Sequence, residues 1–341
     1  MTAETIYESV STAVSRATWQ GLPAIKKTLK VQARTPHSII RYQREYDMLV
    51  SLVSPHICRP LTFDTQNYEI YFEDEGFVSL KDHLAAHDLS LIDRLDLAIS
   101  IITAVASIHQ EEVIHRDINP ANLVIRQHEG GEFEARLIDF GVASFTPQIH
   151  ESDGQLTGTM PYVSPEQTGR VNRTVDQRTD LYSLGATLFE LFAKRPPFIQ
   201  TDPLELIHAH IASMPPSLDS IIDDAPAWLS IVIGKLLEKQ PELRYQTAQA
   251  VLDDFLSGKQ YNNVVDFQPG TTDRVEQIVT PQKLYGRGDI SATLSGLYER
   301  TKHSEVLFAN IVGAPGMGKS AAVRSLERLA TQINNTTACI D

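Results

Sequence analysis

The sequence predicts an α+β protein with a small sheet lobe, a larger helical lobe and the start of a separate α/β unit. The first 75 or so residues alternate short strand-like runs with one amphipathic helix, whereas residues 80–256 are mostly helical in pattern. A polar segment with scattered Gly and Pro then precedes a new strand candidate and a new helix candidate. We expect these boundaries: small lobe about 1–75, large lobe about 77–257, linker 258–282 and third unit 283–341.

The small lobe is predicted from two strand-like runs and one helix. PAIKKTLKV at 23–31 and YEIYF at 68–72 resemble strands, and Pro36 opens a helix between them. The helix carries apolar residues at helical spacing, namely Ile40, Leu49 and Val53. The second strand ends in an acidic stretch at 73–76, which we interpret as the hinge to the large lobe.

The large lobe is predicted from long runs with helical periodicity that Pro and Gly separate. Three of these runs are LIDRLDLAISIITAVASIH at 91–109, LYSLGATLFELF at 181–192 and LSIVIGKLLEKQ at 229–240. With 42% apolar residues in a chain of 341, the sequence can form a large hydrophobic core.

Net charge and cysteine content limit the classes of partner. The formal charge is -13, from 30 Lys and Arg against 43 Asp and Glu, which argues against nucleic acid or anionic lipid as the main partner. Cys58 and Cys339 are too few and too far apart for a disulfide framework, so we expect a reducing compartment, the cytoplasm. The longest apolar run, around 97–108, contains hydroxyl residues and is too short to span a bilayer, so we expect no membrane insertion.

One short motif carries the chemistry of the large lobe. His115, Arg116, Asp117 and Asn122 stand in HRDINPAN, with Asn five residues after Asp. Phosphoryl transfer needs a carboxylate to orient a substrate hydroxyl and accept its proton, and an amide oxygen to hold a magnesium ion. Asp117 as the base and Asn122 as the metal ligand meet these needs on one loop.

Here the sequence resembles the protein kinase superfamily, of the serine/threonine type. The resemblance implies the two-lobed kinase fold over residues 1–257, with a small antiparallel sheet lobe plus one helix and a large helical lobe. It also implies ATP as the phosphate donor, Mg²⁺ or Mn²⁺ as the cofactor and a protein as the substrate.

A second metal ligand is predicted 22 residues after Asp117, where Asp139 stands in LIDFG. Leu137 and Ile138 precede it, as expected at the end of a buried strand. A lone DFG occurs by chance in many chains, but its distance from HRDINPAN makes it specific.

The resemblance also predicts an ion pair in the small lobe. Lys26 in PAIK matches the strand lysine that reaches the ATP phosphates, and Glu45 follows nineteen residues later on the predicted helix. A solvated helix glutamate is the competing interpretation for Glu45, and the order of strand, lysine and helix favours the ion pair.

Several further positions match structural landmarks of the family. Thr159 and the triplet ending in Glu166 resemble the end of an activation segment. Asp180 is expected to brace the backbone of the catalytic loop, and Arg244 to pair with Glu166. Arg116 implies a phosphate partner on the activation segment, although ordinary loop hydroxyls remain the alternative for each candidate, Ser144, Thr146, Ser152 and Thr157.

Two features depart from the family pattern. The stretch IYESVSTAVSRATW before the strand lysine contains no glycine, so we expect Ser9 and Ser11 to form a tight hairpin over ATP, with Glu73 and Glu75 at the hinge. Asn119 stands where serine/threonine kinases usually carry a lysine that holds the transferred phosphate. An uncharged amide there predicts weaker stabilisation of the transition state and slow turnover.

The end of the chain contains a second nucleotide-binding motif. Gly313, Gly318, Lys319 and Ser320 form GxxxxGKS between a strand candidate and a helix candidate, the setting of a P-loop that binds phosphates. Only 21 residues follow Ser320, too few for a working ATPase, so we expect an incomplete AAA-type module.

The glycine-poor loop, SPEQTGRVNRTVDQRTDLYSLG, and LYGR before the P-loop together resemble one bacterial group of signalling proteins. In that group a serine/threonine kinase domain precedes an AAA-type ATPase and a sensor histidine kinase. The resemblance implies that downstream ATPase and histidine kinase regions are natural partners. Three alternatives remain open: a pseudokinase that senses nucleotide or docks partners, a small-molecule phosphotransferase, and an ATPase built on the P-loop alone.

Overall fold

The computed structural model describes residues 4–145, 159–171, 173–222, 225–261, 267–273 and 300. The chain divides into two compact units, Met1–Arg274 and Val275–Asp341, and the following description concerns the first. The predicted P-loop residues Gly313, Gly318, Lys319 and Ser320 lie outside the described residues.

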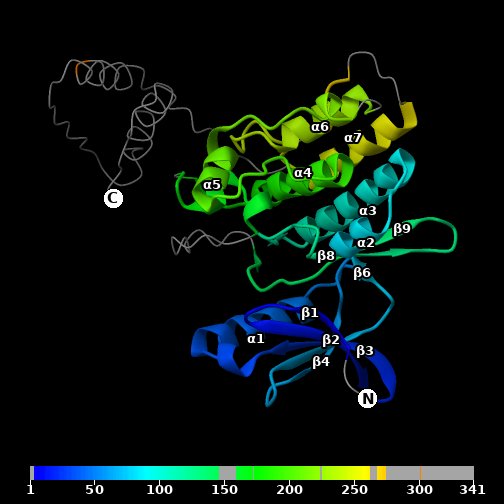
Figure 1. Ribbon diagram of the computed structural model, residues 1–341, viewed down its shortest axis with the longest axis vertical. Coiled ribbons are helices and arrows are strands. Elements are labelled where there is room, and N and C mark those ends of the chain that lie inside the picture. The colour runs from blue at the N-terminus through cyan, green and yellow to red at the C-terminus, as the bar shows by residue number, and fades with distance from the viewer. Residues whose placement is uncertain are drawn as a thin grey trace. The chain divides into compact units, whose positions relative to one another are not determined.

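The small lobe is an antiparallel sheet with one long helix beside it (Figure 1). Its five strands follow the order β1-β2-β3-β5-β4, which confirms the predicted antiparallel sheet lobe. The elements are β1 (Thr5–Glu8), β2 (Thr12–Trp19), β3 (Leu22–Leu29), α1 (Pro36–Ser51), β4 (Pro60–Asp64) and β5 (Glu69–Glu73).

The helix α1 begins and faces the sheet for clear local reasons. Thr35 and Ser38 form a capping box, and Pro36 occupies the first turn, where its missing N–H costs nothing. The expected apolar face is only partly right, because Ile40 and Val53 are exposed while Leu49 is buried. The buried stripe consists of Tyr42, Glu45 and Leu49, so a carboxylate that the pattern counts as polar belongs to the inward face.

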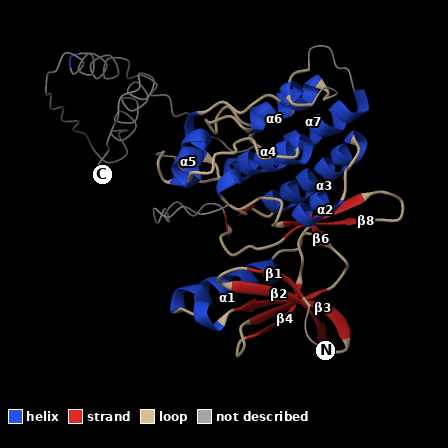
Figure 2. Ribbon diagram, viewed as in Figure 1, coloured by secondary structure: helices blue, strands red, loops and turns tan. Residues whose placement is uncertain are grey.

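The large lobe contains helices and several short strands (Figure 2). A three-stranded sheet, in the order β6-β8-β9, and a two-stranded sheet, β10-β7, belong to this lobe. The elements are β6 (Val78–Ser79), α2 (Leu80–Ala86), α3 (Leu91–Gln110), β7 (Val113–Ile114), β8 (Leu123–Gln127), β9 (Phe133–Leu137), β10 (Ser144–Phe145), α4 (Gln177–Ala193), α5 (Pro203–Ala212), α6 (Ala227–Leu236) and α7 (Ala248–Tyr261).

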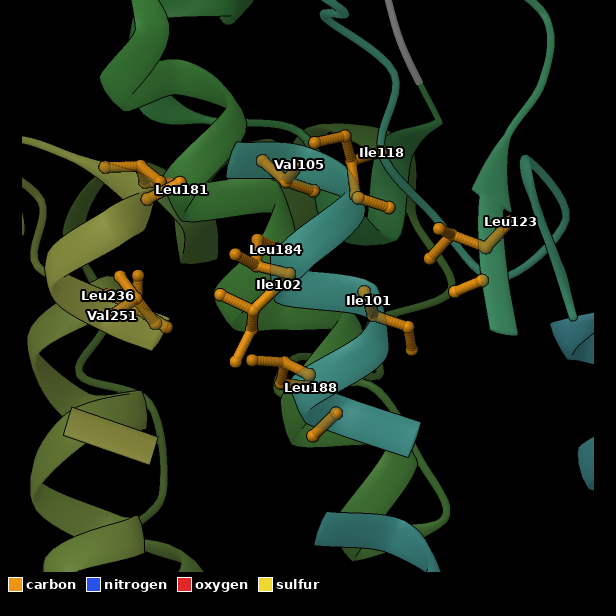
Figure 3. Packing of buried hydrophobic residues seen from close by; sticks show 14 of the residues in the cluster. Ile101, Ile102, Val105, Ile118, Leu123, Leu181, Leu184, Leu188, Leu236 and Val251 are labelled. Carbon is orange, nitrogen blue, oxygen red and sulfur yellow. The ribbon is translucent and has the colours of Figure 1, made fainter. Parts of the chain in front are cut away.

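The core of the large lobe lies between α3, α4, α6 and α7. Figure 3 shows Ile102 of α3 and Leu184 of α4 packed together, with Leu236 and Val251 on the other helices beside them. The predicted catalytic loop, residues 115–122, lies between β7 and β8. Its Ile118 belongs to the same cluster, so this loop is anchored in the core at a fully buried side chain.

The two lobes are joined by backbone contacts near the end of β9. Ile57 forms a parallel bridge with Leu137, and the Leu137 N–H donates to the His56 carbonyl at 2.9 Å. Since the catalytic loop lies between β7 and β8 and Asp139 follows β9, these contacts fix the place where the small lobe meets the predicted chemistry.

Part of the segment expected to be a linker contacts the large lobe. Residues 258–261 complete α7, and Asp273 accepts hydrogen bonds from the backbone N–H groups of Gln246 at 2.8 Å and Thr247 at 3.1 Å. The Gly270 N–H donates to Asp254 at 2.7 Å. Within the described residues, no helix is long and apolar enough to cross a bilayer.

Candidate active site

A buried lysine of β3 connects the small lobe to the large lobe. The Lys27 Nζ lies 2.6 Å from the Glu45 carboxylate on α1 and 3.2 Å from the Asp139 carboxylate. Burial alone would lower the pKa of Lys27, but Asp139 and Glu45 outweigh it and hold that pKa above its usual range. Burial raises the pKa of Glu45, and Lys27 opposes this shift.

The prediction that Lys26 forms this pair is wrong. Lys26 bonds instead to Glu69 on β5, with an Nζ–Oε1 distance of 2.9 Å. Side chains alternate between the faces of a strand, so two adjacent lysines must point to opposite sides of the sheet. The alternation was readable in the sequence, since Ile25, Lys27 and Leu29 share a face, but matching PAIK to the family motif selected the neighbouring lysine.

Asp139 has a backbone geometry that few residues adopt. Its φ is +64°, in the left-handed region that Asp tolerates better than most side chains. The Lys27 ammonium holds the pKa of Asp139 below its usual range, so this carboxylate is ionised at neutral pH. The next residue, Phe140, is buried and packs edge-on against the His115 ring at 4.8 Å between centroids.

Asp117, the predicted base, is surrounded by hydrogen-bond donors. Its Oδ1 accepts from the backbone N–H of Thr159 at 2.8 Å, from the Thr159 hydroxyl at 2.9 Å and from the Asn119 amide at 3.1 Å. Its Oδ2 accepts from the Asn122 amide at 2.8 Å. The Thr159 contact shows that this carboxylate can accept a hydrogen bond from a threonine hydroxyl.

Asn119 and Asn122 have different functions in this loop. Asn119 is 2% exposed, and it joins Asp117 to Thr159 while its Oδ1 accepts from the Ala121 N–H at 2.9 Å. Asn119 therefore closes the loop upon itself. The amide nitrogen of Asn122 is used by Asp117, which leaves its oxygen as the group that can bind a metal ion.

Asn122 and Asp139 fit a magnesium ion that is held partly by nucleotide oxygens. The Ile138 N–H donates to the Asn122 carbonyl at 3.0 Å, so Asn122 lies next to the residue that precedes Asp139. Mg²⁺ prefers oxygen ligands and is commonly bound by one or two protein groups plus substrate phosphates. Among the described residues, no three acidic, His or Cys side chains gather into a complete metal site.

Asp180 braces the catalytic loop from α4. It is fully buried, and it accepts from the backbone N–H groups of His115 and Arg116, both at 2.7 Å. His109 at the end of α3 lies 3.0 Å from the same carboxylate. The bonds from His115 and Arg116 satisfy these backbone N–H groups at the point where the chain turns, since Arg116 has a left-handed φ of +66°.

Glu166 and Arg244 form a buried ion pair as expected from the family pattern. The guanidinium contacts both carboxylate oxygens, at 2.6 and 2.9 Å, and neither side chain is accessible to solvent. Thr179 donates a further bond to Glu166 at 2.9 Å. This bidentate pair fixes the end of the activation segment to the large lobe.

The hinge carries an ion-pair network that the sequence did not reveal. Glu75 pairs with Arg136 through both oxygens, and the Arg126 guanidinium donates to the Glu75 carbonyl at 3.1 Å. Both guanidiniums lie over the Phe77 ring, at 4.7 Å for Arg126 and 4.4 Å for Arg136 from its centroid. Since the Glu75 carboxylate is engaged with Arg136 of β9, this side chain is not available for the predicted nucleotide contact, whereas the Glu73 side chain is exposed.

The candidate phosphorylation sites fall on different parts of the chain. Thr146, Ser152 and Thr157 lie outside the described residues. Ser144 is buried on β10, where its strand pairs with β7. A kinase would not reach this hydroxyl in the arrangement that the structure shows.

Comparison with known proteins gives a family for this arrangement. The protein kinase domain model matches residues 7–256. Serine/threonine-protein kinase PknB of Mycolicibacterium smegmatis is 31% identical over 246 residues, covering 68% of this chain and 38% of the relative. Serine/threonine-protein kinase PknF of Mycobacterium tuberculosis is 32% identical over 218 residues, covering 60% and 44%.

A third relative is named as a histidine kinase and not as a serine/threonine kinase. Hybrid signal transduction histidine kinase G of Dictyostelium discoideum is 32% identical over 194 residues, covering 49% of this chain and 6% of the relative. The chain thus spans less than half the length of each of these three relatives. The family match, the two lobes and the arrangement of Lys27, Asp117 and Asp139 agree, and the chain belongs to the protein kinase family, serine/threonine type.

Proposed function

We propose that this protein transfers the γ-phosphoryl group of ATP to serine or threonine hydroxyls of protein substrates in bacterial signalling. The observation that carries the proposal is the contact of the Lys27 ammonium with both Glu45 and Asp139, because it joins the two lobes at the phosphate-binding lysine. The cytoplasm is the compartment we propose, since it supplies ATP.

Each residue has a stated part in the reaction. Lys27 holds phosphate oxygens of ATP, and Glu45 keeps the ammonium in place. Asp117 orients the substrate hydroxyl and takes its proton as that oxygen bonds to the γ-phosphorus, while the bond to the ADP oxygen breaks. Asn122 and Asp139 would bind Mg²⁺ or Mn²⁺, which neutralises the charge on the phosphates.

We extend the proposal to the regions beyond the kinase domain. The P-loop motif at Gly313, Gly318, Lys319 and Ser320 is proposed as the start of an AAA-type ATPase, with histidine kinase regions further on. The similarity to a hybrid signal transduction histidine kinase supports this arrangement. We propose a protein substrate for the kinase domain, and the ATPase and histidine kinase regions as its partners.

Transfer of labelled phosphate tests the reaction. The full chain would be incubated with radiolabelled ATP, Mg²⁺ or Mn²⁺ and a generic protein such as casein, in parallel with Asp117→Asn. Acid hydrolysis of the product should yield phosphoserine or phosphothreonine for the natural sequence only. ATP binding without transfer under either metal would contradict the proposal and leave a nucleotide-binding pseudokinase.

A further inference from the structure

The turn between β1 and β2 holds its shape without glycine. Residues 6–19 contain none, and the turn carries side chains at Ser9, Val10 and Ser11. The Ser9 hydroxyl accepts from the backbone N–H groups of Thr12 at 2.9 Å and Ser11 at 3.2 Å, while the Ser9 N–H donates to the Thr12 carbonyl at 2.8 Å. The amides of the turn are thereby largely satisfied from within.

The carbonyls of the same turn are bound from outside by Lys30. Its Nζ donates to the Ser9 carbonyl at 2.5 Å, and its backbone N–H donates to the Ser11 carbonyl at 2.9 Å. The ammonium also lies 2.7 Å from the Glu8 carboxylate, which lowers the pKa of Glu8. One residue therefore contacts three of the four positions from Glu8 to Ser11.

Lys30 follows directly after β3, the strand that carries Lys27. Its side chain is 16% exposed, whereas that of Glu8 is 62% exposed. An exposed ion pair contributes little because solvent screens it, but a charge-assisted bond to a backbone carbonyl is stronger. The bond from the ammonium to the Ser9 carbonyl is therefore the main part of this clamp, and the Lys30 backbone N–H adds an uncharged bond to the Ser11 carbonyl.

We propose that Lys30 is a positioning residue for ATP binding, which holds the glycine-free turn in the form that covers the nucleotide. The inference rests on the proposed kinase function. A turn that is ordered before binding loses less conformational entropy when the nucleotide arrives. Lys30 thus links the covering turn to the strand of the phosphate-binding Lys27.

The test measures nucleotide affinity and turnover separately in the full chain. Lys30→Met removes the side-chain donor, and we expect the KM for ATP to rise about three- to tenfold with a smaller change in kcat. Lys30→Arg keeps a charged donor and should restore most of the affinity. Fluorescence titration with an ATP analogue would report the same order of affinities without turnover.

Arg34→Met is the matched control. Arg34 also binds backbone carbonyls in the small lobe, those of Leu29 at 3.0 Å and Asn67 at 2.6 Å, and neither of these bonds reaches the turn. It should lower the melting temperature at least as much as Lys30→Met while leaving the KM for ATP within about twofold.

The outcomes separate the two proposals. An unchanged KM for ATP in Lys30→Met, or an equal rise in Arg34→Met, would overturn the role of Lys30 while the kinase function stands. If Lys30→Met fails to fold, Lys30→Gln, which retains only an uncharged donor, takes its place, and its KM for ATP must exceed that of Lys30→Arg for the inference to hold. A natural chain that binds no ATP would overturn both.

Discussion

The Lys27 ammonium lies 2.6 Å from the Glu45 carboxylate, although one residue is on a strand and the other on a helix that follows it. Both side chains are buried, so Lys27 compensates the Glu45 charge, while Glu45 and Asp139 together compensate that of Lys27. We expect Lys27→Met to reduce kcat/KM for ATP by about a hundredfold or more, because a group that stabilises phosphate charge is lost. Steady-state phosphorylation assays would measure this.

Lys26→Met is the control for that variant. Lys26 is the neighbouring lysine on the opposite face of the sheet, and its partially exposed pair with Glu69 contributes little to stability. Its kcat/KM should stay within about twofold of the natural value. Loss of activity in Lys26→Met with retention in Lys27→Met would reverse the assignment.

Asn119→Lys should speed the reaction. The side chain adjoins Asp117 and Thr159, and a cation there would stabilise charge on the transferred phosphate. We expect kcat to rise about tenfold with little change in the KM for ATP, as measured with saturating protein substrate.

Asn119→Ala separates the charge from the loop geometry. It leaves the Ala121 N–H without its acceptor, so we expect kcat to fall. A lysine variant that is slower than the natural protein would show that the amide contacts matter more than charge at this position.

Sequence motifs predicted the parts of the site that lie close together along the chain. Asp117 and Asn122 share one loop, and Asp139 follows a strand whose apolar residues are readable, so local spacing fixed their neighbourhood. The two lobes could be predicted because the periodicity of apolar residues, which distinguishes strands from helices, is also a local property of the sequence. The structure places Glu45 beside a strand lysine, but this lysine is Lys27 and not the predicted Lys26.

The missed features depend on strand face or on distant residues. Lys27 was missed because one position along a strand reverses the face. The Glu75–Arg136 pair and the Asn119–Thr159 bond join residues 61 and 40 positions apart, and no local pattern marks either. The contacts of residues 267–273 with the large lobe were not predicted, because the Gly and Pro content of this segment is typical of a linker.

The buried Glu166–Arg244 pair should matter greatly for stability. Arg244→Met would leave a buried carboxylate without its partner, and we expect the free energy of unfolding to fall by about 3–5 kcal/mol. The double variant Arg244→Met with Glu166→Gln should recover part of this loss, because the remaining group is uncharged. Urea denaturation would measure each value.

An exposed pair in the same lobe provides the comparison. Arg173 and Glu242 lie 2.5 Å apart, and both remain accessible to solvent. Arg173→Met should cost less than about 1 kcal/mol. Similar costs for the buried and exposed pairs would contradict the importance assigned to burial.

His210 should make the protein less stable in acid. Burial lowers the pKa of His210 to about 3, and the nearby Lys239 adds to this shift. Tyr182 lies 3.0 Å from the ring and Lys239 3.2 Å from the Tyr182 hydroxyl, so the site already holds one cation. Below the ordinary histidine pKa near 6.5 the unfolded chain binds a proton that the folded chain refuses.

Stability from this group is therefore fully present above about pH 6.5 and falls toward pH 3, by up to about 1.4 kcal/mol per pH unit. His210→Gln cannot titrate and keeps an acceptor for Tyr182, so its free energy of unfolding should fall less steeply between about pH 6 and 5. His208→Gln, an exposed histidine on the same helix, should follow the natural protein. Equal slopes for all three in urea denaturation would show that His210 takes up its proton in the folded state.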